Sequence, residues 1–351
     1  MLFSGGGTLG SVTPLIAVAE TAAAQNEQTE FLWVGTTDGP ERALVEQLGI
    51  KFESITSGRL RRFLTLRNLA TPYLVIKGLI EAHRLIGEWR PDVVVSAGGF
   101  VAVPVVWAAW LRGVPVHIHQ MDWRPGLANK LSAPFAKSVS VTFEKSRGDF
   151  AESKVTVTGN PVRQFLFRGS IEQAREIFNM REGLSTVLVL GGGTGAVNLN
   201  RLTVEALDSL GEVQVLHVTG RGKQVAVSDP PHTYHQFEFL DAGMAHAYAV
   251  ADLVVTRAGM GTLTELAALG LPAIIVPIPR SHQEDNAQVF VGAGAAENFS
   301  EQLPANELSN LVNAILSDSD RRRDMSSAMS ALNSRTAAQN VAEILFSYGQ
   351  S

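Results

Sequence analysis

The chain has 351 residues, of which 45% are hydrophobic and 18% are charged. This length and apolar content predict a globular protein that is large enough for two domains. The net charge is −5, so no general attraction to nucleic acid is expected. The sequence contains no cysteine, which excludes disulfides, thiolate catalysis and thiolate metal sites.

No membrane-crossing or secretion segment is expected. The first residues run into glycines and lack the basic and apolar regions of a signal peptide. The longest apolar run is FVAVPVVWAAWL at 100–111, which contains Pro104 and is too short to span a bilayer.

In the first half of the chain, β-branched runs alternate with helical patterns. Strands are expected in FLWVG (31–35), DVVVSAGG (92–99), PVHIHQ (115–120) and KVTVTGN (154–160). Helices are expected at 14–25, 40–48 and 68–86. This βαβ series predicts a parallel, doubly wound sheet.

The pattern restarts in the second half of the chain. Strands are expected in TVLVLGGG (186–193), EVQVLHVTG (212–220), ADLVVTRAG (251–259) and LPAIIVPIP (271–279). The predicted fold class is therefore α/β, with two Rossmann-like domains facing each other across a cleft. We place the domains at 1–158 and 159–335, with a linker at 159–163. The last helix, at about 336–351, is expected to pack back on the first domain.

Two glycine-rich turns open the two series, SGGGTLGSVTP at 4–14 and LGGGTGAVN at 190–198. Such a turn exposes backbone N–H groups at a helix N-terminus, where a phosphate or diphosphate is attracted. Neither turn spells GxGxxG with an acidic residue about 20 positions later, which disfavours a dinucleotide site. The alternative is that the glycines serve only tight turns and close packing.

A more specific pattern is TRAGMGTLTELAALGLPAIIVPIPRSHQEDNA at 256–287. A helix expected to begin near Met260 would offer its first amides and Thr262 to a phosphate, and Glu265 to the hydroxyls of a ribose. This combination indicates a nucleotide-sugar site. The alternative is a capping box, because Thr262 and Glu265 have its Thr-x-x-Glu spacing.

Taken together, these motifs resemble the MurG family. The resemblance rests on GGGTLGSVTPLIAVAE, SAGGFVAVP, HQMDWRPGLANK, GNPVR, GGGTGAVNLN and RAGMGTLTELAALGLPAIIVP followed by HQEDNA, in order along nearly the whole chain. Members of that family are peripheral-membrane transferases that add N-acetylglucosamine to lipid I in peptidoglycan synthesis. The resemblance implies a GT-B fold, UDP-GlcNAc as donor, a lipid-diphosphate-linked muramyl peptide as acceptor, no metal or cofactor, and a location at the cytoplasmic face of the cell membrane.

The resemblance also implies site residues. The second glycine turn would lie beside the donor diphosphate, and the first would face the acceptor diphosphate and the transferred sugar. Arg163 matches a donor-contacting arginine, with an interdomain ion pair as its alternative role. His282 and Asn286 are expected to support the donor loop. The implied substrate-binding residues are Thr8, Leu9, Gly10, Asp122, Arg163, Gly193, Thr194, Leu240, Met260, Gly261, Thr262, Leu263, Thr264, Glu265 and Gln283.

The sequence departs from the family pattern at two positions near the expected chemistry. Ser11 stands where the family ordinarily has a histidine, and the family's HEQN is His119-Gln120-Met121-Asp122 here. Because serine is too weak a base to deprotonate a sugar hydroxyl, we predict that Asp122 accepts the proton. The alternatives are that Asp122 caps a helix beginning near Arg124 or pairs with that arginine. His119 is expected to be structural.

Two further segments complete the prediction. Asp318-Ser319-Asp320 is interpreted as a helix cap and not as a metal site. The segment 57–80 has arginines among apolar residues and no acid, which indicates contact with an anionic membrane surface, with a solvated helix as the alternative.

The function predicted by the resemblance is inverting glycosyl transfer. The alternatives are a UDP-GlcNAc 2-epimerase and a catalytically silent nucleotide-sugar-binding scaffold.

Overall fold

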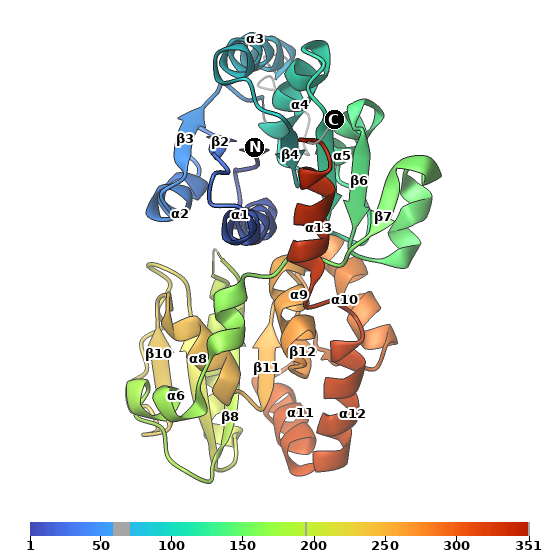
Figure 1. Cartoon of the computed structure of the whole chain (residues 1–351). Coiled ribbons are helices and arrows are strands. Elements are labelled where there is room, and N and C mark those ends of the chain that lie inside the picture. Colours follow the sequence, from blue (N-terminus) through green and yellow to red (C-terminus); the bar gives the residue numbers. More distant parts are fainter. Residues whose placement is uncertain (59–70, 194, 350–351) are drawn as a thin grey trace. The chain divides into compact units, whose positions relative to one another are not determined.

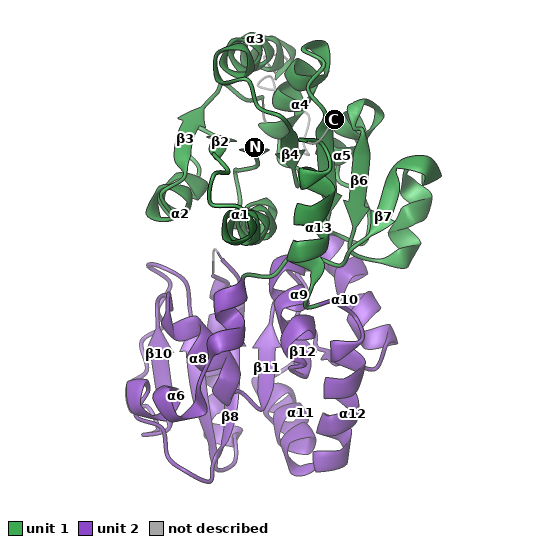
Figure 2. Ribbon diagram, viewed as in Figure 1, with its two compact units in different colours: residues 1–163, 335–351 green, residues 164–334 purple. Residues whose placement is uncertain are grey.

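The computed structural model describes residues 1–58, 71–193 and 195–349 (Figure 1). The chain divides into two compact units (Figure 2). Unit 1 comprises residues 1–163 and 335–351, and unit 2 comprises residues 164–334.

Unit 1 alternates strands with helices, as its apolar runs predicted. Its strands are β1 (Leu2–Ser4), β2 (Leu32–Gly35), β3 (Lys51–Ser54), β4 (Val94–Ser96), β5 (Val116–Gln120), β6 (Ser138–Val141) and β7 (Val155–Val157). Its helices are α1 (Thr13–Gln25), α2 (Glu41–Gln47), α3 (Thr71–Trp89), α4 (Ala102–Leu111), α5 (Leu127–Ser132) and α13 (Ala337–Phe346), with a short 3₁₀ turn η1 (Leu9–Ser11).

The sheet of unit 1 is parallel, with the order β3-β2-β1-β4-β5-β6-β7. Both of its faces are covered, which explains why every residue of β2 and β4 is buried. One face packs on α3 and α4, and the other packs on α1 and α13. The last helix thus lies beside α1, because Val341, Ala342 and Leu345 complete the core under β1 (Figure 1).

Unit 2 repeats the same plan. Its strands are β8 (Ser185–Leu190), β9 (Val213–Val218), β10 (Tyr234–Phe237), β11 (Leu253–Thr256), β12 (Ala273–Ile275) and β13 (Ala296–Asn298). Its helices are α6 (Ile171–Ile177), α7 (Val197–Ala206), α8 (Gly243–Val250), α9 (Met260–Leu269), α10 (His282–Gly292), α11 (Ala305–Ser317) and α12 (Ser319–Ser330).

The sheet of unit 2 is also parallel, in the order β10-β9-β8-β11-β12-β13. Its core joins the valines of β8 and β9 to the apolar sides of α7 and α11. The predicted α/β class with two doubly wound sheets is confirmed. The runs in which strands were expected do not include β1, β3, β6, β10 or β13.

A buried chain of polar side chains crosses β5 and β6 of unit 1. Tyr348 donates to Ser138 Oγ (2.6 Å), and Ser138 Oγ is 2.6 Å from His117 Nδ1. Ser140 Oγ lies between His117 Nε2 (2.9 Å) and His119 Nδ1 (2.8 Å), and His119 Nε2 is 2.9 Å from Asn160 Oδ1. The network ties the end of the C-terminal helix to the loop after β7, which contains Asn160.

Burial makes both histidines poor bases. The pKa of His117 is lowered to about 3, by burial and then by the neighbouring His119, and burial lowers the pKa of His119 to about 4. Both side chains are therefore neutral in the folded protein at neutral pH. In the unfolded chain the same groups titrate near 6.5, so folding is opposed by proton uptake below that pH.

We predict that the free energy of unfolding falls as the pH is lowered from about 6.5 to about 4. Each histidine contributes a slope of up to about 1.4 kcal/mol per pH unit, because the unfolded chain binds a proton that the folded chain does not. Replacing His119→Gln, which retains a polar atom for Asn160, should reduce that slope in urea titrations at pH 7, 6 and 5. A slope unchanged from wild type would contradict the account, and exposed His232→Gln serves as the control.

Candidate functional site

The strand order brings four strand-to-helix turns together in pairs, one pair in each unit. In unit 1 the order reverses between β1 and β4, and in unit 2 it reverses between β8 and β11. Ligands of doubly wound sheets bind beyond the carboxyl ends of the strands at such a reversal. The turns after these four strands are residues 5–12, 97–101, 191–196 and 257–259. These are the segments that the sequence singled out, so each unit has one candidate site.

In unit 2, the turn after β8 is shaped by close backbone packing. Gly195 has φ +70°, and a Cβ atom there would lie 2.2 Å from the Thr219 carbonyl oxygen. The buried Asn200 amide donates to the same carbonyl (3.0 Å), which fixes the start of α7 against β9. Gly193 is exposed, and Thr194 lies outside the described residues. Only glycine fits at 195, because the backbone of the turn passes so close to the end of β9.

The turn after β11 leads into α9. Gly259 is the N-cap residue and no side chain caps the helix, so Thr262 lies inside the first turn. The capping-box interpretation of Thr262 and Glu265 is therefore wrong, because the helix begins too early for that spacing to act. Gly261 and Thr262 are half-buried in this first turn, whose N–H groups have no partner within the helix. Such a terminus is suited to an anion.

Three side chains of the same segment are part of the buried core of unit 2. Met260, Leu263 and Thr264 are buried, and Thr264 donates back to the Met260 carbonyl oxygen (2.8 Å). Their side chains therefore hold α9 in place. A contact of these residues with a ligand would come from the backbone.

Glu265 is held by a residue that the sequence did not single out. Tyr248, which is on α8, donates its hydroxyl to Glu265 Oε2 at 2.8 Å. Burial, followed by the negative charge of Glu265, raises the pKa of Tyr248 well above its ordinary value. The phenol thus stays protonated and remains a donor, which orients the carboxylate on the exposed side of the first turns of α9. Only the folded structure reveals this role, because the two residues are 17 positions apart in the sequence.

The helix α10 supports the same site. Ser281 caps it by accepting from the Gln283 amide (3.2 Å), and Gln283 Oε1 accepts from the Ile278 amide (3.1 Å). Asn286 is buried and donates to the Ala258 carbonyl oxygen (3.2 Å), directly before α9. Asn286 thus supports the loop, as expected. Leu240 is half-buried in the loop after β10.

In unit 1, the turn after β1 ends in a buried hydroxyl. Thr8 and Gly10 are exposed and Leu9 is half-buried. Ser11 is 9% exposed, and within the described part of the chain its Oγ atom has no hydrogen-bond partner. A buried hydroxyl without a partner is costly unless a ligand or water completes it. Ser11 thus places a polar oxygen atom close to the N-terminus of α1.

Asp122 follows the end of β5 and is half-buried. The Gln120 side chain donates to the Asp122 carbonyl oxygen (2.7 Å), and the buried Asn129 donates to Gln120 Oε1 (2.6 Å). The following helix α5 begins at Leu127 with Gly126 as its N-cap residue. The interpretation of Asp122 as the cap of a helix near Arg124 is therefore wrong.

Three other predicted residues have structural partners. Arg163 forms an ion pair with Glu20 of α1 (2.8 Å), and both residues belong to unit 1. The alternative of an interdomain ion pair therefore does not describe this contact. His119 is fully buried, and Asp318 caps α12 by accepting from the Arg321 amide (2.9 Å), which confirms the capping interpretation.

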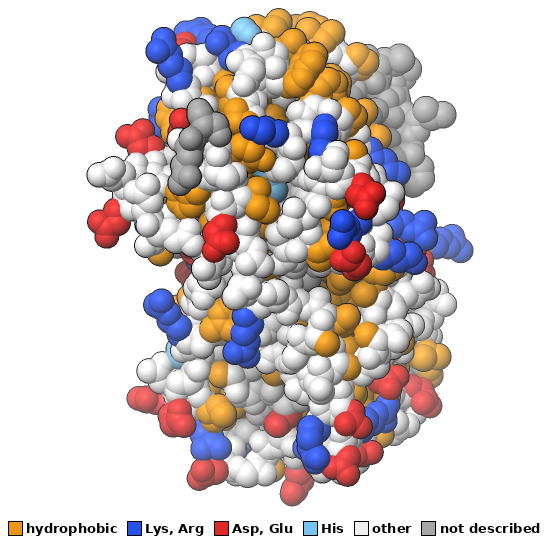
Figure 3. Space-filling model, turned by 45° about the vertical axis from the view of Figure 1, so that its right-hand side comes forward, with side chains coloured by type: hydrophobic (Ala, Val, Ile, Leu, Met, Phe, Trp, Pro, Cys, Tyr) orange, Lys and Arg blue, Asp and Glu red, His pale blue; other side chains and the backbone are white. Residues whose placement is uncertain are grey.

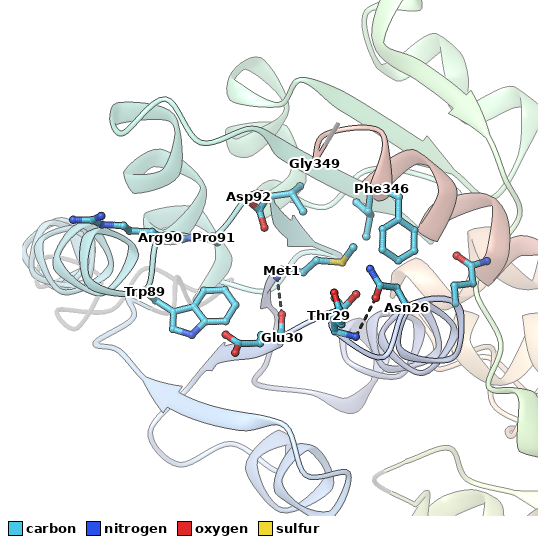
Figure 4. Close-up of a pocket in the computed structure, with 14 residues that line it drawn as sticks. Met1, Asn26, Thr29, Glu30, Trp89, Arg90, Pro91, Asp92, Phe346 and Gly349 are labelled. Carbon is cyan, nitrogen blue, oxygen red and sulfur yellow. Dashed lines mark hydrogen bonds between the residues drawn. The ribbon is translucent and has the colours of Figure 1, made fainter. Parts of the chain in front are cut away.

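A cavity of about 670 Å³ opens at the opposite edge of the unit 1 sheet. It lies at the amino ends of the strands, between Trp89, Asp92 and Phe346, where the Met1 ammonium donates to the Glu30 carbonyl oxygen (2.8 Å; Figure 4). Because parallel sheets present ligand sites at the carboxyl ends of their strands, this cavity is not the candidate site.

Two doubly wound parallel-sheet units, each with its candidate site at the reversal of strand order, are the arrangement of the GT-B fold. The comparisons with known proteins give the family. Residues 1–141 match the glycosyltransferase family 28 N-terminal domain, and residues 186–341 match its C-terminal domain. The chain belongs to glycosyltransferase family 28.

Its relatives agree with this assignment. The UDP-N-acetylglucosamine–N-acetylmuramyl-(pentapeptide) pyrophosphoryl-undecaprenol N-acetylglucosamine transferase of Legionella pneumophila strain Paris is 35% identical over 351 residues, covering 98% of this chain and 96% of that protein. The crystal structure of Acinetobacter baumannii MurG has TM-score 0.76 and 27% identity, covering 99% of both chains. The predicted resemblance to the MurG family is confirmed.

The fold is shared more widely. The crystal structure of UDP-GlcNAc 2-epimerase from Neisseria meningitidis has TM-score 0.70, covering 99% of this chain and 98% of that chain. Its sequence identity is 14%, so this likeness concerns the fold alone.

Proposed function

We propose that the protein transfers N-acetylglucosamine from UDP-GlcNAc to the muramyl sugar of an undecaprenyl-diphosphate-linked peptide. The observation that carries the proposal is the match to transferases of that name over 98% of this chain. The unit 2 site supports the donor, because it combines the N-terminus of α9 with an oriented carboxylate, Glu265. The helix N-terminus attracts the diphosphate, and the carboxylate can accept hydrogen bonds from the ribose hydroxyls.

The reaction is an inverting displacement. The acceptor hydroxyl attacks the anomeric carbon of the donor, the bond from that carbon to the UDP oxygen breaks, and a base takes the hydroxyl proton. The helix N-terminus at α9 and the turn after β8 would stabilise the charge that develops on UDP. The acceptor diphosphate is assigned to the turns after β1 and β4 in unit 1.

One experiment separates this function from its alternatives. The protein is incubated with UDP-GlcNAc, with and without a lipid I analogue, and the release of UDP is measured. A transferase releases UDP only when the acceptor is present. Epimerisation without the acceptor would favour the 2-epimerase, and donor binding without turnover would favour a silent binding protein.

Glu265→Ala should weaken UDP-GlcNAc binding by about 1.5–3 kcal/mol, because charged hydrogen bonds to the ribose are lost. Tyr248→Phe should cause a smaller loss, since the carboxylate remains but is less well oriented. Binding is measured by calorimetry, with exposed Glu284→Ala as the control for the change of charge. Unchanged affinity of the Glu265 variant would remove this residue from the donor site.

Asp122 is proposed as the proton acceptor, because a carboxylate is a far stronger base than the hydroxyl of Ser11. Asp122→Asn restores the amide that the family usually has, so donor binding should be preserved. The turnover number should fall by about 10²–10⁴-fold. Near-normal turnover with an unchanged pH profile would exclude Asp122 as the base, and recovery on adding Ser11→His would support it.

We further propose that unit 1 associates with the cytoplasmic face of an anionic membrane. No helix in the described ranges is long and apolar enough to cross one. Tyr73, Ile76 and Ile80 are spaced along one side of α3 and are 68%, 57% and 66% exposed. Trp110 is exposed at the end of α4, which packs on α3, and hydrophobic side chains gather over this end of unit 1 (Figure 3). Arg61, Arg62 and Arg67 lie outside the described residues.

Replacing Ile76→Ser and Ile80→Ser should lower the affinity for anionic vesicles by about 10-fold or more, because each isoleucine contributes buried apolar area in the interface. Vesicle sedimentation measures the effect. The matched control is Ile171→Ser with Ile177→Ser on α6, which are 43% and 55% exposed in unit 2. Equal losses in both pairs would contradict the assignment of the membrane surface to α3.

A further inference from the structure

A carboxylate is buried directly beside the glycine-rich turn of unit 1. Glu41 is the first residue of α2, where an acidic side chain is ordinarily solvated, yet it is 0% exposed. Its Oε1 atom accepts from the Thr36 amide (2.7 Å) and the Thr36 hydroxyl (2.5 Å). Its Oε2 atom accepts from the Gly7 amide (3.1 Å), which belongs to the turn after β1.

The surrounding backbone leaves room for this carboxylate. A Cβ atom at Gly6 would lie 2.2 Å from Glu41 Oε1, and one at Gly39 would lie 2.0 Å from Glu41 Oε2. Two glycines far apart in the sequence thus form a cradle for one side chain. The need to accommodate Glu41 explains the glycine at position 6, which has no positive φ to require it.

The same turn is held from two other directions. Trp33 of β2 donates its indole N–H to the Gly5 carbonyl oxygen (3.0 Å), and Gly6 passes close to Gly99, where a Cβ atom would lie 2.9 Å from the Gly6 oxygen. The turn is therefore fixed at Gly5, Gly6 and Gly7, directly before the exposed Thr8. Because the Gly7 N–H donates to Glu41, it is not available to bind a substrate phosphate.

We propose that Glu41 is a positioning residue for the acceptor side of the reaction. Its carboxylate anchors Gly7 and so sets the path of residues 8–11, which end in the buried Ser11 hydroxyl. The inference rests on the proposed transferase function. Glu41 touches neither substrate, and it acts through the turn.

The test is Glu41→Gln, which keeps the shape of the side chain and replaces one oxygen by an amide nitrogen. When the remaining side-chain oxygen accepts from the Thr36 amide and hydroxyl, the new NH₂ group faces the Gly7 N–H. Both groups are donors, so the hydrogen bond to Gly7 is lost. The expected result is a fall of about 10–100-fold in kcat/KM for a lipid I analogue, with the KM for UDP-GlcNAc unchanged. Residues 5–11 should exchange their amide hydrogens faster than in wild type.

Thr36→Ala is the matched control, because it removes one hydrogen bond of Glu41 and leaves both backbone amides paired. It should leave exchange at residues 5–11 and the acceptor kinetics near wild type. The proposal is overturned if Glu41→Gln leaves both readouts unchanged, or if both variants lower acceptor and donor parameters alike. The exchange measurement needs no substrate, so it decides the anchoring role even if the wild-type protein transfers no sugar.

Discussion

The parallel pairing of neighbouring strands is the constraint on which the rest of this structure depends. A parallel sheet directs all its strand-to-helix turns to one edge, and the strand orders bring together the turns after β1 and β4 and those after β8 and β11. Segments far apart in the chain, such as residues 5–12 and 97–101, thereby share one site. The site in each unit follows from topology before any side chain is considered.

Within this frame, buried polar anchors give the turns their shape. Glu41 holds the Gly7 amide in unit 1, and Tyr248 holds the Glu265 carboxylate in unit 2. Each anchor is itself satisfied by hydrogen bonds, because an unpaired buried polar group would cost more than it contributes. The residues proposed to meet substrates are thus oriented by a second set of residues that does not meet them.

The sequence predicted what is local and left out what depends on neighbouring strands. Runs such as LVVT in β11 are buried on both faces and could be recognised directly. The strand β6 reads SVSV because Ser138 and Ser140 are partners of His117 and His119, which no local pattern reveals. The strands β3, β10 and β13 lie at sheet edges and have only one neighbouring strand each. They are partly polar, so their apolar patterns are too weak to be recognised in the sequence. The expected helix start near Met260 is correct, and for that reason the capping-box alternative for Thr262 and Glu265 fails, because Thr262 lies inside the helix and not at its N-cap.

The central claim is that the donor binds at the carboxyl edge of the unit 2 sheet, where β8 and β11 adjoin. Amide hydrogen exchange with and without UDP tests it directly, since a bound diphosphate protects the amides that it contacts. The account predicts slower exchange in residues 191–197 and 257–265, with residues 5–11 unaffected. Protection confined to the turns of unit 1, or to the cavity beside Trp89 and Phe346, would contradict it.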